Sequence, residues 1–310
     1  MSKELKSWGL LLFLACVWGS SFILMKRGMH TTDGLPIFSD LQVGALRMLF
    51  AGLVLAPFAV RHVKKIKTWQ QFVSLSIVGF SGNFFPAFLF TYAETGLSSG
   101  FAGMLNSFTP IFTIVIGYTV FKVRLTALQL FGMFIGTAGI VLLMIAGKSI
   151  SMTGTWFHIF AIVLATLMYG ISLNTIKHTL QMFKAVEITS LAFFIVLLPA
   201  AIANLSFGTS QTIQNNPHAM EGLGYIAILS IVGTALAVIL FNRIISMSSA
   251  LFASSVTYFI PIVAVLIGLY FGERISWGQV GSMCIVLLGV FIINLANFRK
   301  TSRKAEHTNK

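Results

Sequence analysis

Apolar stretches long enough to cross a membrane recur almost end to end along this chain. A helix needs roughly 18 or more apolar residues to span the hydrocarbon core, and here such stretches are separated only by short polar breaks. The chain is 56% hydrophobic and 9% charged, with a mean hydropathy of +0.89, far from the composition of a soluble domain. The sequence therefore predicts an all-α integral membrane protein whose main surroundings are the lipid bilayer.

The polar breaks divide the chain into ten predicted transmembrane helices. They cover residues 8–25, 39–60, 70–93, 100–121, 127–147, 155–175, 187–205, 223–243, 250–271 and 277–297. The seventh is the least regular, because Pro199 interrupts a short apolar run. The only sizeable loop expected is the polar segment 206–222. The first apolar run is too long for a signal peptide and no cleavage site follows it, so we expect it to remain in the mature protein.

The basic residues gather on one predicted side of the membrane. With an even number of spans both termini share a side, and 16 of the 21 Lys and Arg residues fall there. Four fall on the other side: Lys26, Arg27, Lys148 and Arg274. Because cytoplasmic loops carry an excess of Lys and Arg, we expect both termini in the cytoplasm and the chain in a bacterial inner membrane. The same clusters account for the net charge of +13 without a nucleic-acid partner.

The two halves of the chain resemble each other in sequence. A shift of 151 residues pairs Trp18/Tyr169, Ser21/Ser172, Lys26/Lys177, Gly82/Gly233, Phe90/Phe241, Phe101/Phe252, Pro110/Pro261 and Gly117/Gly268, and a shift of 150 then pairs Arg124/Arg274, Gln129/Gln279 and Gly139/Gly289. We expect a first repeat over residues 1–147, a second over 148–298 and a basic cytoplasmic tail over 299–310.

Five helices per repeat is an odd number, so the second repeat must enter the membrane upside down. Two inverted five-helix repeats are a plan of secondary transporters, which bind a small-molecule substrate near the midplane between the repeats. The sequence thus predicts ten transmembrane helices as two inverted repeats, working by alternating access. A duplicated scaffold without transport is the alternative.

Several segments resemble the EamA family of the drug/metabolite transporter superfamily. They are Trp18-Gly19-Ser20-Ser21-Phe22, Leu46-Arg47, the region from Tyr92 to Pro110-Ile111-Phe112, Pro261, Phe271-Gly272-Glu273-Arg274-Ile275, Gln279 and Gly289. The resemblance covers residues 8–297 and implies export of amino acids or related metabolites. The first half departs from it, since Val123 stands where the second half has Glu273.

Polar residues deep in apolar helices are the candidates for a substrate site. Hydrocarbon tolerates them only where they face another helix or a water-filled cavity. Those near the repeat signature predict a cavity lined by Trp18, Ser21, Asn83, Asn106, Ser107, Tyr169, Ser172, Thr234, Thr257 and Tyr258. For a single residue the alternative is hydrogen bonding between helices, worth about 0.6 kcal/mol per pair. For Trp18 and Tyr169 it is packing against the adjacent glycines, Gly19 and Gly170.

Two prolines and several phenylalanines add to this prediction. Pro110 and Pro261 follow polar pairs by about one helical turn, where proline removes a backbone donor and can kink the helix. A carbonyl freed there would suit a polar ligand. Phenylalanines in the same helices predict an apolar lining that favours amphipathic cargo: Phe84, Phe85, Phe88 and Phe108.

Arg47 is the basic residue expected inside the membrane. A buried guanidinium must reach outward or find a partner, and it could attract an anionic substrate. Glu94, at the end of the third helix, is the counter-ion we predict and a candidate for proton coupling.

The sequence shows no sign of catalysis. The six histidines are scattered without metal-ligand spacing, so we expect no cofactor, no metal and no enzymatic activity. Gly132, Gly136 and Gly139 recur at helical spacing and predict close approach of the fifth and tenth helices, with a homodimer as a further outcome.

Three other functions stay open at this point. A sugar-phosphate or nucleotide-sugar exchanger would want at least two deep cations, and a membrane-embedded lipid enzyme would want clustered His, Asp or Glu. A structural or sensory subunit would change neither accumulation nor efflux when deleted.

Overall fold

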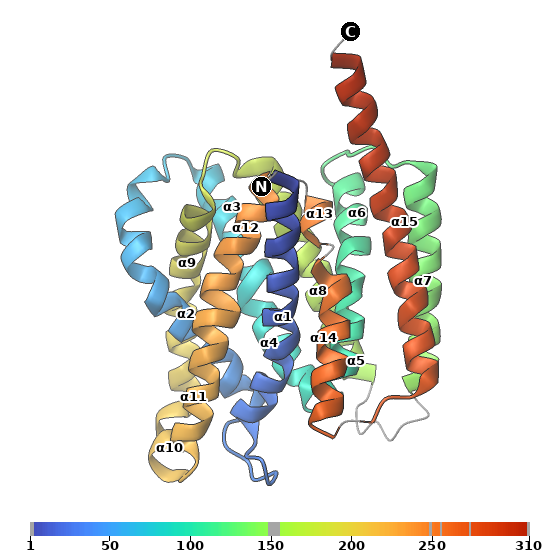
Figure 1. The fold of residues 1–310 in the computed structure, drawn as a ribbon. Coiled ribbons are helices and arrows are strands. Elements are labelled where there is room, and N and C mark those ends of the chain that lie inside the picture. The colour runs from blue at the N-terminus through green and yellow to red at the C-terminus, as the bar shows by residue number, and fades with distance from the viewer. Residues whose placement is uncertain (1–2, 148–155, 248–249, 255, 273, 309–310) are drawn as a thin grey trace.

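The computed structural model describes residues 3–147, 156–247, 250–254, 256–272 and 274–308, and it is a bundle of helices (Figure 1). The α-helices are α1 (Lys3–Met29), α2 (Asp40–His62), α3 (Trp69–Gly79), α4 (Phe85–Glu94), α5 (Ser99–Leu105), α6 (Thr109–Thr119), α7 (Ala127–Gly147), α8 (Trp156–Thr179), α9 (Ala185–Ser206), α10 (Thr209–Asn215), α11 (Ala219–Ser230), α12 (Ala237–Met247), α13 (Ala250–Ser254), α14 (Val256–Tyr270) and α15 (Trp277–Thr308). Short 3-10 or π segments join them: η1 (Val63–Lys65), η2 (Phe80–Phe84), η3 (Asn106–Phe108) and η4 (Ile231–Leu236).

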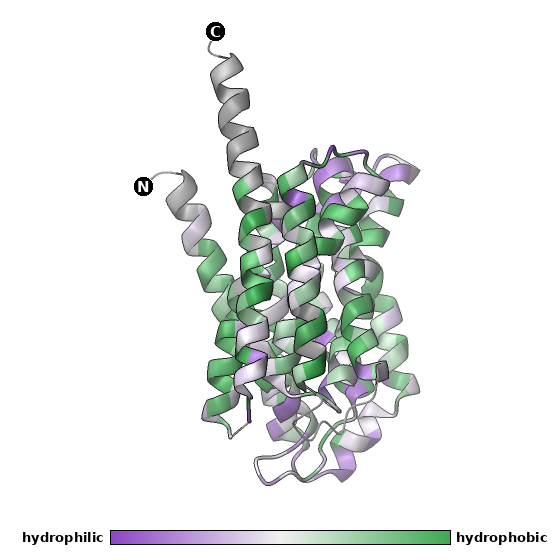
Figure 2. Ribbon diagram, turned by 90° about the vertical axis from the view of Figure 1, so that its right-hand side faces the viewer, coloured by the Kyte–Doolittle hydropathy of each residue, from purple (hydrophilic) through white to green (hydrophobic). Residues whose placement is uncertain are grey.

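These elements follow the apolar runs of the sequence. Within the described residues, eight helical units are long and apolar enough to cross a membrane, and three of them are interrupted by η2, η3 or η4. Hydrophobic residues cover the middle of the bundle, whereas hydrophilic residues lie mainly at its two ends (Figure 2). The prediction of an all-α membrane fold is confirmed. The described apolar parts of α7 and α15 are shorter, at Ala127–Gly139 and Trp277–Gly289, so the count of ten spans stays a prediction.

Two local predictions meet a definite outcome. α9 runs unbroken from Ala185 to Ser206 although Pro199 lies inside it. The segment expected to be a loop, residues 206–222, instead forms α10, because Gly208 takes a left-handed conformation and starts a new helix. The amide of Asn216 then donates to the carbonyls of Pro36 (2.9 Å) and Ile37 (3.2 Å), which ties this segment to the first half.

α7 and α15 pack backbone against backbone at one flank of the bundle (Figure 1). A Cβ added at Gly289 would collide with the backbone of Gly136 and lie 2.7 Å from the carbonyl oxygen of Gly132. A Cβ at Gly139 would lie 2.7 Å from the amide nitrogen of Val286. The glycine pattern therefore serves close packing within the chain, and the homodimer stays a prediction.

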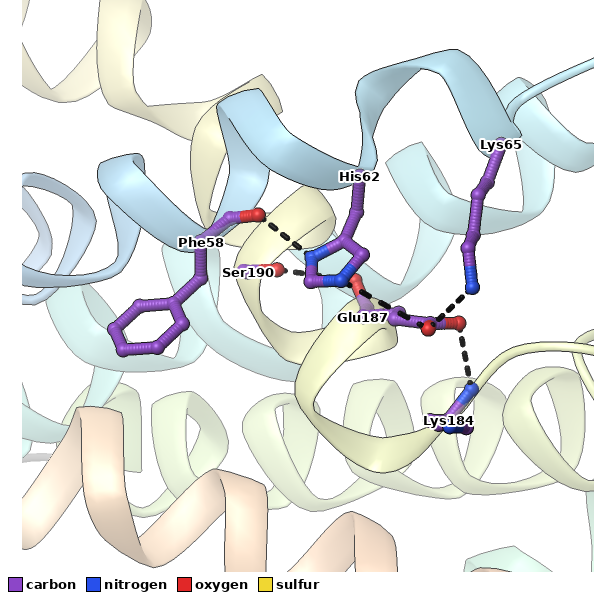
Figure 3. A network of polar contacts seen from close by, with 6 residues as sticks. All are labelled: Phe58, His62, Lys65, Lys184, Glu187 and Ser190. Carbon is purple, nitrogen blue, oxygen red and sulfur yellow. Dashed lines mark hydrogen bonds and ion pairs between the residues drawn. The ribbon is translucent and has the colours of Figure 1, made fainter.

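α2 and α9 form the corresponding pair at the opposite flank (Figure 1). Their contact ends in a polar network around Glu187, whose side chain is only 4% exposed (Figure 3). Glu187 Oε1 accepts from Lys65 Nζ at 2.6 Å and lies 4.0 Å from His62 Nε2, while Oε2 accepts the backbone N–H of Lys184 at 3.0 Å. One carboxylate thus caps the start of α9 and joins it to the end of α2.

The beginning of α1 and the end of α15 lie at the same end of the bundle (Figure 1). α15 continues past the other helices there and carries the predicted basic tail as far as Thr308.

Candidate functional site

A cavity inside the bundle is lined by residues from both halves of the chain. The volume in which the centre of a water molecule fits is about 110 Å³. A single buried water needs roughly 10–15 Å³ of this volume. Eight of the ten residues predicted to line a cavity lie on it: Trp18, Ser21, Asn83, Asn106, Tyr169, Ser172, Thr234 and Thr257. The lining also includes Phe22, Met25, Arg47, Met48, Val78, Gly82, Phe90, Thr109, Leu173, Ile176, Val238, Phe241, Asn242 and Val256.

Each half contributes a π-helical segment to this cavity, at positions that match under the shift of 151. η2 carries Asn83, whose amide donates to the carbonyl of Val78 at 3.3 Å. η4 carries Thr234, whose hydroxyl donates to the carbonyl of Leu229 at 3.0 Å. In both cases the acceptor lies five residues earlier, so a cavity side chain satisfies a carbonyl that the widened turn releases.

Each segment contains one glycine, Gly82 or Gly233, whose carbonyl does not accept the usual α-helical hydrogen bond. The two glycines match under the shift of 151, but the cause differs between them. Pro86 has no N–H to donate to the carbonyl of Gly82, as an α-helix would require. At the matching place, the Gly233 carbonyl accepts the indole N–H of Trp18 at 2.9 Å. A proline of the same half therefore accompanies the π-helical segment η2, whereas a side chain from the opposite half, Trp18, accompanies η4.

Aromatic pairs cross between the halves in the same matched way. Trp18 meets Phe241 edge to face, with ring centroids 4.9 Å apart. Its counterpart Tyr169 stacks on Phe90, the counterpart of Phe241, at 5.9 Å. The rings form apolar walls on the cavity, and their edges and faces are suited to a flat or apolar ligand.

The glycines beside these rings pack closely against other helices. A Cβ at Gly19 would lie 2.5 Å from Val263 Cβ, and one at Gly170 would lie 2.9 Å from the backbone carbon of Phe112. Trp18 and Tyr169 thus border the cavity, and their glycine neighbours hold helices together.

Arg47 extends from α2 into the cavity. Its Nε donates to the hydroxyl of Thr234 at 2.8 Å, and Nη1 approaches the sulfur of Met25 at 4.0 Å. The predicted partner was Glu94, and this pairing is wrong. Glu94 ends α4 and accepts from Ser99 at the start of α5 at 3.2 Å, outside the cavity lining.

The match to known protein families decides what kind of protein carries this cavity. A family model described as the EamA-like transporter family matches residues 6–145 and again residues 156–295. The chain belongs to the EamA-like transporter family. The resemblance read from the motifs is confirmed, and the protein is a small-molecule transporter of the drug/metabolite transporter superfamily with several membrane-spanning helices.

Two relatives match this EamA-like transporter over most of its length. The uncharacterized inner membrane transporter YedA of Escherichia coli (strain K12) is 24% identical over 297 residues, covering 94% of this chain and 91% of that one. A probable amino-acid metabolite efflux pump of Salmonella typhimurium is 25% identical, covering 94% and 95%. A solved crystal structure matches with a TM-score of 0.62 at 17% identity, covering 94% and 97%, which shows a shared fold.

Two predicted lining residues of the EamA-like transporter, Ser107 and Tyr258, are not part of the described lining. Ser107 is buried and donates to the carbonyl of Thr257 at 3.1 Å, which joins η3 to α14. Tyr258 belongs to α14, but its side chain lies outside the described part of the structure. The chain forms the 3-10 turn η3 immediately before Pro110, whereas Pro261 lies within α14.

The prediction of which phenylalanines line the cavity is wrong. Phe84, Phe85, Phe88 and Phe108 are absent from the described lining, and Phe22, Phe90 and Phe241 take this role. The first three lie on other faces of the helix than the cavity residues Asn83 and Phe90: Phe84 packs on Phe88 at 5.0 Å, and Phe85 is 45% exposed. Phe108 stacks on Phe112 at 5.9 Å.

Sequence reasoning also missed Asn242 and Thr109. Asn242 lies one residue before the end of the predicted helix 223–243, yet it is buried on the cavity and donates to Thr189 at 2.8 Å. Thr109 donates to the carbonyl of Asn106 at 2.9 Å. The position of Thr109 immediately before Pro110 was the available signal.

Proposed function

We propose that the protein is a secondary transporter of the inner membrane that exports amino acids or related small metabolites by alternating access. In this proposal ten helices form two inverted five-helix repeats, residues 1–147 and 148–298. The end of the bundle that carries both termini faces the cytoplasm, where the excess of Lys and Arg favours it.

The observation that carries this proposal is the construction of the cavity from matched residues. Asn83 and Thr234 cap equivalent π-helical segments, and Trp18/Phe241 and Tyr169/Phe90 are equivalent pairs across the halves. Two equivalent walls around one pocket allow the halves to exchange conformations about a fixed binding site, which is the basis of alternating access.

The relatives support the choice of cargo. One is named an inner membrane transporter and another a probable amino-acid metabolite efflux pump. The cavity combines amide and hydroxyl groups with aromatic rings, which suits small amphipathic molecules.

A reconstitution experiment tests the proposal. Purified protein in liposomes loaded with a panel of amino acids and related metabolites should exchange at least one of them with external labelled compound. Asn106→Ala should slow this exchange, because the Asn106 amide lies on the cavity. Asn215→Ala, on exposed α10, is the control that should not. Equal exchange by both variants for every cargo found would contradict the cavity assignment, and the absence of any exchange would contradict transport of this class.

Sugar-phosphate or nucleotide-sugar exchange is less well supported. A phosphate group with two charges calls for several cations, and of the described residues lining the cavity Arg47 alone is charged.

A further inference from the structure

Arg47 breaks the symmetry of an otherwise matched cavity. Its counterpart under the shift of 151 is Leu198, which lies on α9 and is 68% exposed on the outside of the bundle. The Arg47 guanidinium therefore donates a hydrogen bond to Thr234 of η4, whereas no cation of the described residues contacts the matching Asn83 of η2. The cavity consequently has one positive end.

The guanidinium is incompletely paired within the described structure. A guanidinium carries five N–H donors, and here Nε serves Thr234 while Nη1 meets only the weak acceptor of Met25. No carboxylate of the described residues lies within ion-pair distance of Arg47, and no described lining residue is acidic. A charge held in a membrane without a counter-ion favours any mobile anion that can reach it.

Two other hydrogen-bond donors line the same cavity as this cation. The Tyr169 ring is close enough to Arg47 for the two groups to interact electrostatically, and its hydroxyl has no hydrogen-bond partner among the described residues. The amide nitrogen of Asn106 is likewise without an acceptor in the described part of the chain. Together with Arg47, these two groups give the cavity hydrogen-bond donors from which a carboxylate can accept.

The rest of the cavity selects for an apolar body. Phe22, Phe90 and Phe241 line it together with Trp18 and several aliphatic side chains. A ligand anchored by its carboxylate at Arg47 can place a ring or branched chain against these walls, where burial of apolar surface favours binding.

We infer that the cargo carries one carboxylate and an apolar body, that its carboxylate binds Arg47, and that an amino group is not required for its recognition. This inference rests on the proposed transport function and narrows its substrate class. It includes amino acids with apolar side chains, and it extends to their deaminated analogues. It excludes amines that lack the carboxylate, because a cationic ligand would face Arg47 without any acidic partner among the described lining residues.

A series of four ligands with one phenyl body tests the inference by calorimetric binding to the purified full-length protein. They are 3-phenylpropionate, phenylalanine, 3-phenylpropionamide and phenethylamine. We expect the first two to bind with similar affinity, and the amide and the amine to bind at least about tenfold more weakly, or about 1.4 kcal/mol. The acid and its amide have nearly the same shape, so their ratio reports the charge.

Two variants assign this ratio to one residue. Arg47→Gln should reduce the preference for acid over amide to nearly one, and Arg47→Lys should keep part of it. Arg243→Gln, at an exposed arginine of α12, should leave the preference unchanged. Thermal melting identifies variants that fail to fold, and in that case the wild-type ratio and Arg47→Lys decide.

Each outcome has a definite meaning. Equal binding of acid and amide, strong binding of phenethylamine, or an undiminished preference in folded Arg47→Gln would overturn the inference. So would binding of none of the four ligands. The liposome exchange experiment judges transport separately, so a cargo without a carboxylate found there would defeat this inference and leave the proposed function standing.

Discussion

The α7/α15 pair and the α2/α9 pair join the two halves of the chain at opposite flanks, but by different means (Figure 1). In α7/α15, Gly136 and Gly289 allow the two backbones to touch. In α2/α9, side chains fill the contact, since a Cβ at Gly52 would lie 2.7 Å from a terminal methyl group of Leu197. The ion pair between Lys65 and Glu187 lies at one end of this contact. Backbone contact is difficult to rearrange, whereas side chains can change rotamer.

This difference indicates which contact can give way during transport. The cavity lies beside α2, since Arg47 and Met48 both line it, and no described residue of α7 or α15 does. We expect the α2/α9 contact to rearrange while α7/α15 stays fixed, and four predictions test this expectation.

The largest expected effect comes from locking the α2/α9 contact. A Cβ at position 52 would lie 3.5 Å from Leu197 Cβ, within the range for a disulfide. In a chain whose Cys16 and Cys284 are replaced by alanine, Gly52→Cys with Leu197→Cys should lose nearly all liposome exchange on oxidation and regain it on reduction.

The matched crosslink joins α7 and α15. A Cβ at position 278 would lie 3.2 Å from Ala146 Cβ, a few tenths of an ångström closer than in a relaxed disulfide, so Ala146→Cys with Gly278→Cys should form a disulfide after a small local shift. Oxidation of this pair should leave exchange intact. Equal inhibition by the two crosslinks would show that the flanks do not differ in mobility.

The next largest effect concerns the stability of the α7/α15 contact. Gly289→Ala should lower the free energy of unfolding by about 1–3 kcal/mol, because its new methyl group collides with backbone atoms of Gly136. Gly281→Ala on the same helix meets nothing within 4 Å and should be neutral or slightly stabilising. Thermal melts in detergent compare the two, and equal melting temperatures would argue against backbone contact.

A smaller effect is expected at the polar end of α2/α9. Glu187→Ala removes the acceptor of Lys65 and of the Lys184 N–H, at a cost of about 1 kcal/mol. Part of this cost should disappear in high salt, which already screens the pair with the half-exposed Lys65. Glu221→Ala, at an exposed side chain in the first turn of α11, serves as the control in the same melts.

The smallest effect is expected at Gly52. Gly52→Ala places a methyl group against the mobile end of Leu197, while alanine favours the helix by up to about 1 kcal/mol. The two contributions should offset each other to a change below about 1 kcal/mol. A loss as large as that of Gly289→Ala would mean that α2 and α9 are as rigidly packed as α7 and α15.

Most of the helices could be predicted because each apolar run has a visible end. α7 covers Ala127–Gly147, the range that its flanking polar residues indicated. The cavity was predictable in outline since hydrocarbon restricts where Asn83, Asn106 or Thr234 can point. Their matching positions in the repeat then placed them around one centre.

The π-helical segments and the partner of Arg47 were not predictable in this way. A hydropathy pattern identifies a helix but not a widened turn inside it, and one such turn changes which face the following residues present. Pro86 was an available signal for η2, but η4 has Ala237 at that position and depends on Trp18 from a distant part of the chain.

Each π-helical turn also rotates the part of the helix that follows it relative to the part that precedes it. One additional residue per turn corresponds to about 100° of rotation, so everything after η2 is turned by that amount relative to a straight α-helix. Phe90 and Phe241 lie beyond η2 and η4, and this rotation sets the direction in which they face. Removing a single residue from η2 would therefore redirect the whole of α4 without changing any side chain on it.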